Sequence, residues 1–161
     1  MNILVTGGAG YIGSTVARQL LDAGHSVSVF DNLSSGHRAA VPKAATFVQG
    51  DILDRAALDS VLGGAHFAAV MHFAAFIEAG ESMREPGRFF RNNVTGALTL
   101  IDAAVAHDVQ RFVFSSTAGV YASRMARWRR LTRSRRPAST APPNTWSSRR
   151  WSGITRSTGC A

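Results

Sequence analysis

Residues 2–13 read Asn2-Ile-Leu-Val-Thr-Gly-Gly-Ala-Gly-Tyr-Ile-Gly13, an apolar run that enters a glycine-rich turn. An amphipathic segment, residues 14–23, follows at once, so the stretch predicts a strand over 2–6, a tight turn and a helix over 13–23. Glycines at 7, 10 and 13 suit a sharp bend, close approach to a pyrophosphate and tight packing of helix on strand. The free N–H groups that begin such a helix favour phosphate.

A valine-rich alternating segment, Ser26 to Phe30, predicts a second strand that ends at Asp31. An acid at this point accepts hydrogen bonds from the ribose hydroxyls of adenosine. The next residue is Asn32 and not an arginine, so no adjacent positive charge can bind the 2′-phosphate of NADP. The sequence therefore favours NAD over NADP. The alternative interpretation makes Asp31 only a turn-forming acid.

Three more strands are predicted over 46–49, 67–73 and 111–115, with helices over 54–62 and 86–107. Strands that alternate with helices through right-handed crossovers predict an α/β fold. We therefore expect a Rossmann-like doubly wound parallel sheet of order 3-2-1-4-5. Ligands bind such sheets at the carboxyl edge, where the fifth strand delivers Ser115.

Several residues near this edge allow two interpretations. Asp51 and Ile52 follow the third strand and suit an adenine, but Asp51 also suits a helix N-cap. His72 lies in an apolar strand, where a satisfied core histidine is favoured over a catalytic one. Asn92 either meets a cofactor edge or lies on a helix surface, and the small residues 74–75 let a ligand approach the backbone.

The 161 residues suffice for one domain with a core, and no apolar run is long enough to span a bilayer. The N-terminus shows no secretion signal, and Cys160 is the single cysteine, so a reducing, cytoplasmic setting is expected, without a metal site. The net charge of +8 is unevenly divided. Residues 1–121 carry −2, whereas residues 122–161 hold ten arginines, all three tryptophans and no acid. The division predicts a nucleotide-binding domain over 1–121 and an irregular, poorly ordered basic tail over 122–161.

The motifs of residues 1–121 resemble those of extended short-chain dehydrogenase/reductase enzymes, and most of all the UDP-glucose (UDP-galactose) 4-epimerase family. They are Thr6-Gly-Gly-Ala-Gly-Tyr-Ile-Gly13, Asp31-Asn-Leu-Ser-Ser-Gly36, Gly50-Asp-Ile52, His72-Phe-Ala-Ala75, Gly80-Glu-Ser82, Asn92-Asn-Val-Thr-Gly96 and Phe114-Ser-Ser-Thr117. The Gly80-Glu-Ser82 segment favours the epimerases over the related sugar-nucleotide dehydratases and reductases, which remain the alternative.

The resemblance implies retained NAD, which takes a hydride from the 4-hydroxyl of a UDP-hexose and returns it to the other face of the keto sugar. It implies a catalytic role for Thr117, which would hydrogen-bond the reacting hydroxyl, and a cofactor site that extends over many positions. Those cofactor-binding positions are Gly7, Gly10, Tyr11, Ile12, Gly13, Asp31, Asn32, Leu33, Ser34, Ser35, Gly36, Asp51, Ile52, Phe73, Ala74, Ala75, Ile77, Asn92 and Ser115. Ile77 stands where family members often have lysine. The resemblance also implies a homodimer to which residues 86–107 contribute.

Two features of the family are missing from the sequence. The Tyr-x-x-x-Lys pair, whose tyrosine is the base, has no counterpart, because no tyrosine follows Tyr121 and no lysine follows Lys43. The second, substrate-binding domain is also missing. We therefore expect the UDP-hexose site to be incomplete and the chain to have little or no epimerase activity.

The tail suggests a shifted reading frame. Suppose that one base was lost just after the Tyr121 codon. If that base is restored, codons that encode Ala122–Ala126 in the present frame can encode Gly-Glu-Pro-Asp-Gly in the frame before the loss. Codons for Ala138–Trp146 can likewise encode Val-Tyr-Gly-Ala-Thr-Lys-His-Leu, which contains Tyr-x-x-x-Lys. The rival hypothesis is an NAD-binding module whose arginine- and tryptophan-rich tail binds nucleic acid. We do not expect nucleic acid to be a partner. The coding DNA across codons 119–124 tests the hypothesis of a lost base.

Overall fold

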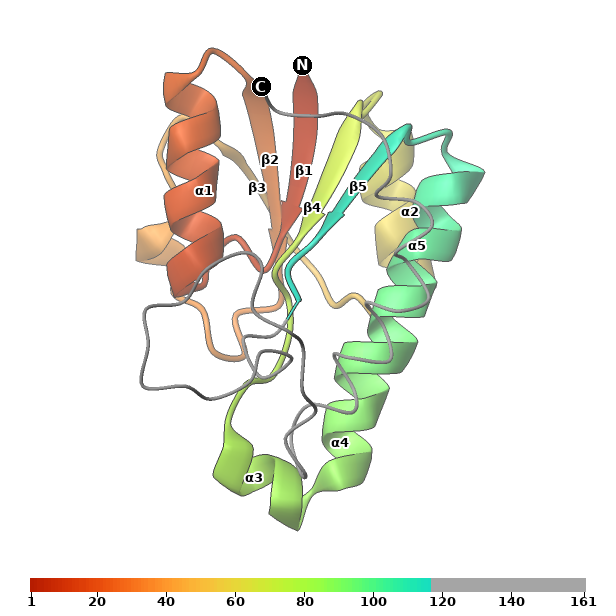
Figure 1. The fold of residues 1–161 in the computed structure, drawn as a ribbon. Coiled ribbons are helices and arrows are strands. Elements are labelled where there is room, and N and C mark those ends of the chain that lie inside the picture. Colours follow the sequence, from red (N-terminus) through yellow and green to blue (C-terminus); the bar gives the residue numbers. More distant parts are fainter. Residues whose placement is uncertain (117–161) are drawn as a thin grey trace, which may run out of the picture.

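The computed structural model describes residues 1–116, which form a five-stranded parallel sheet (Figure 1). The strands run in the order β3-β2-β1-β4-β5, as predicted. They are β1 (Asn2–Thr6), β2 (Ser26–Asp31), β3 (Thr46–Gln49), β4 (Ala69–His72) and β5 (Arg111–Phe114). The order reverses direction between β1 and β4, and this is where open α/β sheets form their ligand crevice.

Helices cover both faces of the sheet. In Figure 1, α1 (Tyr11–Asp22) lies on one side, and α2 (Arg55–Gly63) and α5 (Ala97–Ala106) lie together on the other. Successive side chains of β1 point to opposite faces of the sheet. Leu4 packs in the apolar cluster with α2 and α5, whereas Ile3 and Val5 pack in the cluster with α1. Each face therefore has its own apolar core.

The segment that was predicted as one helix over 86–107 has three helical parts. They are α4 (Pro86–Phe90), a π-helical turn η2 (Arg91–Gly96) and α5. Proline occupies the start of α4, as expected for a residue without an N–H. The π turn was not predicted, because the apolar spacing of the sequence does not distinguish it from an α-helix.

Other element bounds differ modestly from the predictions. Helix α1 begins at Tyr11 rather than at residue 13, and Gly24, with φ of 80°, lies just beyond its C-terminus. Strand β4 covers only residues 69–72 of the predicted 67–73. A short helix α3 (Ala79–Arg84) and a 3₁₀ turn η1 (Arg38–Ala40) complete the described elements. Helix α3 was not predicted from the sequence.

Candidate functional site

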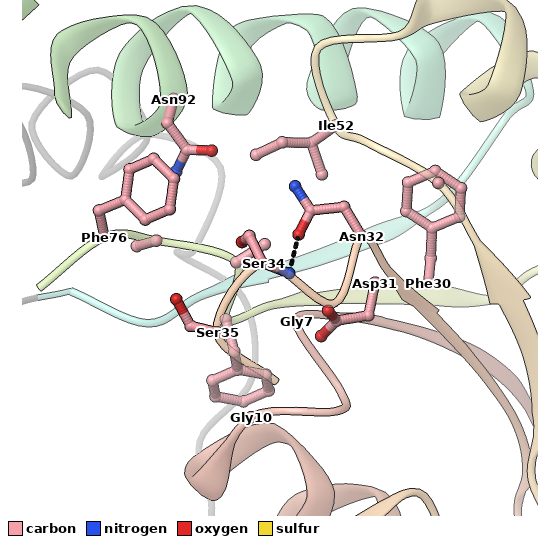
Figure 2. Close-up of a pocket in the computed structure, with 14 residues that line it drawn as sticks. Gly7, Gly10, Phe30, Asp31, Asn32, Ser34, Ser35, Ile52, Phe76 and Asn92 are labelled. Atoms are coloured by element: carbon pink, nitrogen blue, oxygen red, sulfur yellow. Dashed lines mark hydrogen bonds between the residues drawn. The ribbon is translucent and has the colours of Figure 1, made fainter. Parts of the chain in front are cut away.

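A cleft opens at the carboxyl edge of the sheet, between the turn after β1 and the loops after β2, β3 and β4 (Figure 2). The π turn closes one side through Asn92. The cleft is lined by Gly7, Gly10, Phe30, Asp31, Asn32, Ser34, Ser35, Gly50, Ile52, Phe73, Ala74, Ala75, Phe76 and Asn92. Segments far apart in the sequence thus meet at the edge where the parallel sheet was expected to bind a ligand.

The glycine turn has the geometry that its sequence predicted. Gly7 has φ of 72°, and a Cβ there would lie 2.5 Å from the backbone nitrogen of Ala74. A Cβ on Gly13 would collide with the carbonyl oxygen of Gly7, so the helix packs directly on the turn. Sharp bending and tight packing are therefore both confirmed at these two positions, whereas the contact of Gly10 with a pyrophosphate stays a prediction.

The N-terminus of α1 suits an anion. Its N-cap is Gly10, which has no side chain to cap the helix, and the first turn holds no acid. The first backbone bond of the helix runs from the N–H of Ser14 to the carbonyl of Gly10. The preceding N–H groups, at Tyr11 and Ile12, thus begin a helix whose dipole favours negative charge. The side chains of Tyr11 and Ile12 are exposed and do not line the cleft.

Asp31 is a turn-forming acid, which was one of the two interpretations, and its contact with a ribose stays a prediction. Its Oδ2 accepts a hydrogen bond of 2.9 Å from the N–H of Ala9, and its Oδ1 accepts one of 2.8 Å from the N–H of Leu33. The residue is buried, yet its side chain lines the cleft. Each carboxylate oxygen has a second lone pair, so the turn-forming acid can still accept a hydroxyl from a ligand.

Asn32 joins the loop after β2 to the loop after β3. Its Nδ2 donates to Oδ2 of Asp51 over 2.9 Å, and its Oδ1 accepts from the N–H of Ser34, the bond drawn in Figure 2. Oδ1 of Asp51 accepts from the N–H of Leu53. The N-cap of α2 is Asp54, whose carboxylate accepts from the N–H of Ala57. The alternative that made Asp51 the N-cap is therefore wrong.

The apolar wall of the cleft contains three residues that are absent from the predicted cofactor-binding positions, Phe30, Gly50 and Phe76. A Cβ on Gly50 would lie 2.5 Å from the ring of Phe30, so a larger residue does not fit without displacing the ring. A similar close contact joins Ile52 to the π turn, because a Cβ on Gly96 would lie 2.7 Å from Cδ1 of Ile52. A glycine directly after a strand was the available signal for Gly50.

His72 is a core histidine, as favoured from the sequence. It is 2% exposed, its Nδ1 lies 2.7 Å from the hydroxyl oxygen of Thr6, and its ring packs against Phe114. Burial lowers the pKa of His72 from 6.5 to about 4, so the ring is neutral at pH 7. A neutral, hydrogen-bonded ring beneath the turn has a structural role.

Asn92 is buried and lines the cleft, so the alternative of a helix-surface asparagine is wrong. Its Nδ2 donates to Oδ1 of the neighbouring Asn93 over 2.8 Å. In Figure 2, Asn92 stands beside the ring of Phe76, opposite Ile52. The π turn thus brings a polar amide to a wall that is otherwise apolar.

Eight of the predicted cofactor residues do not line this cleft: Tyr11, Ile12, Gly13, Leu33, Gly36, Asp51, Ile77 and Ser115. Ile77 is 79% exposed, and Ser115 follows β5, where its N–H donates to the carbonyl of His72. Their roles stay predictions. The predicted catalytic residue, Thr117, and the tail over 122–161 lie outside the described residues.

Within residues 1–116, no group of three or more histidine, cysteine, aspartate or glutamate side chains is placed to hold a metal ion. None of the helices in this part of the chain is long and apolar enough to cross a membrane.

Comparison with known proteins identifies UDP-glucose 4-epimerases among the relatives of this chain. The chain is 49% identical over 121 residues to the UDP-glucose 4-epimerase of Corynebacterium glutamicum. The aligned region covers 75% of this chain and 36% of the relative. It is 52% identical over 120 residues to the UDP-glucose 4-epimerase of Rhizobium meliloti (strain 1021), with 74% and 36% covered. The chain thus spans about a third of the length of these curated relatives.

A solved structure has the same fold. The UDP-glucose 4-epimerase of Brucella ovis in complex with NAD superposes with a TM-score of 0.85 at 36% identity, and the match covers 94% of this chain and 47% of that one. The model of the NAD dependent epimerase/dehydratase family matches residues 3–145. The chain therefore belongs to the NAD dependent epimerase/dehydratase family.

Proposed function

We propose that residues 1–121 bind NAD and form the cofactor-binding part of a UDP-glucose 4-epimerase. The observation that carries the proposal is the cleft itself, where an uncapped helix N-terminus and the buried carboxylate of Asp31 meet at the carboxyl edge of the sheet. The relatives of about 50% identity bear that name, and a structural neighbour is a complex with NAD.

The residues of the cleft fit the parts of this dinucleotide. The N–H groups that begin α1 suit the pyrophosphate, and Gly10 keeps a side chain out of its way. Asp31 offers carboxylate lone pairs to the adenosine ribose hydroxyls. Ile52 and Asn92 face the cleft from opposite segments, and the pair suits an adenine that needs apolar packing and a polar edge.

Bound NAD would supply the hydride acceptor for the 4-hydroxyl of a UDP-hexose. Thr117 is our candidate for hydrogen bonding that hydroxyl, and Ser115 lies on the same segment beyond β5. The sequence after β5 lacks a Tyr-x-x-x-Lys pair. We therefore propose a division at residue 121, and we expect this chain to hold the cofactor without efficient epimerisation.

The further associations are also proposals. A UDP-hexose is the substrate class that fits an epimerase, and a reducing cytoplasm suits a chain with a single cysteine, Cys160. A homodimer through residues 86–107 is supported by the exposed Phe90 and Val105 on this helical segment. We expect neither a membrane nor a nucleic acid as partner.

The test is a calorimetric titration of the 161-residue chain with NAD and, separately, with NADP. Saturable binding of NAD that is at least about tenfold tighter than that of NADP supports the proposal. The absence of NAD binding by a folded chain contradicts it. Conversion of UDP-galactose to UDP-glucose, measured on the same preparation, separates the two parts of the proposal, since rapid turnover contradicts only the expected lack of activity.

A further inference from the structure

The loop after β4 forms one wall of the cleft without belonging to a helix or strand. Residues 73–78 have no regular secondary structure, yet Phe73, Ala74, Ala75 and Phe76 all line the cleft. The N–H of Phe73 still donates to the carbonyl of Thr6, at the end of β1. Beyond that point the loop leaves the sheet, so its backbone needs hydrogen-bond partners from elsewhere.

The side chain of Asn93 supplies those partners at Phe76. Its Oδ1 accepts from the N–H of Phe76 over 2.9 Å, and its Nδ2 donates to the carbonyl of Phe76 over 2.9 Å. One amide thus pairs with both polar groups of a single residue, as a neighbouring strand does in a sheet. Asn93 is 4% exposed, so water does not replace these bonds easily.

Asn93 also orients the asparagine that lines the cleft. Its Oδ1 accepts the Nδ2 of Asn92 over 2.8 Å, in addition to the N–H of Phe76. This bond fixes the side-chain amide of Asn92, so that the Oδ1 of Asn92 points away from Asn93. Both asparagines belong to the π turn, and both are buried.

The ring of Phe76 is held as firmly as its backbone. Its centroid lies 5.6 Å from that of Phe89, and the guanidinium carbon of Arg88 lies 4.6 Å from the ring centroid. Both partners come from α4, which directly precedes the π turn. The wall at Phe76 is therefore attached to the α4–η2 segment at two points, the ring and the peptide groups.

We propose that Asn93 is a positioning residue of the nucleotide cleft, which holds Phe76 and Asn92 in place and does not itself contact the ligand. Asn93 is absent from the residues that line the cleft, whereas both of its partners belong to them. The inference rests on the proposed NAD site. It assigns to Asn93 part of the affinity for the adenosine half, through pre-organisation of that wall.

The first test compares Asn93→Ala with Asn92→Ala in the full chain. Asn93→Ala is expected to weaken NAD binding about tenfold, the scale of one or two lost hydrogen bonds, and to speed hydrogen exchange at the N–H of Phe76. Asn92→Ala is expected to weaken binding without altering that exchange. NAD affinity that is unchanged in Asn93→Ala, despite faster exchange at Phe76, overturns the inference.

The second test uses Asn93→Asp, because a protonated carboxyl has both the donor and the acceptor of the amide and an ionised one lacks the donor. Relative to the unchanged chain at the same pH, this variant is expected to bind NAD weakly near about pH 8 and to recover near about pH 5, where burial favours the protonated form. Asn93→Ala is expected to stay weak at both.

A variant that merely loosened the fold would show no such recovery, so equal weakness of Asn93→Asp at both pH values overturns the positioning role. If the unchanged chain fails to bind NAD, the proposed function fails, and this inference fails with it.

Discussion

The hydroxyl of Thr6 lies 2.7 Å from Nδ1 of His72, and both side chains are buried where β1 and β4 end beneath the glycine turn. Burial lowers the pKa of His72 from 6.5 to about 4. Between these values the unfolded chain binds more protons than the folded one, so stability falls as the pH falls from about 6.5 to about 4. The contribution of His72 to this loss is about 3 kcal/mol.

This pH dependence is measured as the free energy of unfolding in urea at a series of pH values. The variant His72→Gln is expected to be less stable at pH 7 and to lose less stability between about pH 6.5 and about pH 4. Because the carboxylates titrate in both proteins, the difference between the two curves isolates His72. Parallel curves would show that His72 does not account for the acid sensitivity.

The second prediction concerns two glycines with similar φ and different surroundings. Gly7 and Gly24 have φ of 72° and 80°, but a Cβ on Gly7 would meet the backbone of Ala74, whereas one on Gly24 would meet nothing within 4 Å. Gly24→Ala is expected to lower the stability by about 1 kcal/mol, the cost of the left-handed conformation. Gly7→Ala is expected to cost at least about 3 kcal/mol, because the backbone at Ala74, in the loop after β4, must also shift.

Thermal or urea unfolding of the two variants checks this difference. Equal losses would mean that the turn accommodates a methyl group without moving the loop after β4.

A third prediction follows from the two backbone bonds of Asp31. Asp31→Ala leaves the N–H groups of Ala9 and Leu33 without their acceptor, and we expect a loss of about 3 kcal/mol in stability, in addition to weaker NAD binding. Asp22→Ala is the matched control, because Asp22 is exposed on α1, and it should change stability by less than about 0.5 kcal/mol. Similar stabilities of the two variants in urea would contradict this account of the turn.

The fourth prediction separates two aspartates on one loop. Asp54 is the N-cap of α2. Asp54→Ala is expected to lower the stability by about 1 kcal/mol and to leave the NAD affinity unchanged. Asp54→Ser should retain most of the stability, because serine also caps helices. Asp51→Ala removes the partner of Asn32 at the cleft and is expected to weaken NAD binding. Affinities and unfolding midpoints of all three variants check this, and a reversed pattern would refute the division of roles.

Features that depend on neighbours in the sequence were predictable. The glycines of residues 7–13 allow the turn to bend without help from distant segments, and Asp31 lies at the end of its strand. The order of the strands and this part of the cleft could therefore be predicted from the sequence. The contact of Gly50 with Phe30 and the pairing of Asn93 with Phe76 were not predicted. Each joins segments 17 or more residues apart, and their local patterns are ordinary for a loop or a helix.

The close approach of the Ile52 side chain to Gly96 affects the shape of the cleft. Because the side chain of Ile52 rests against the bare backbone of the π turn, the loop after β3 and the helical segment meet without a spacer. The spacing of the two segments on this side therefore depends on both the glycine at position 96 and the side chain at position 52. A methyl group at position 96 would displace the end of the Ile52 side chain and so reshape this side of the pocket, whereas a smaller residue at position 52 would leave a gap against the π turn.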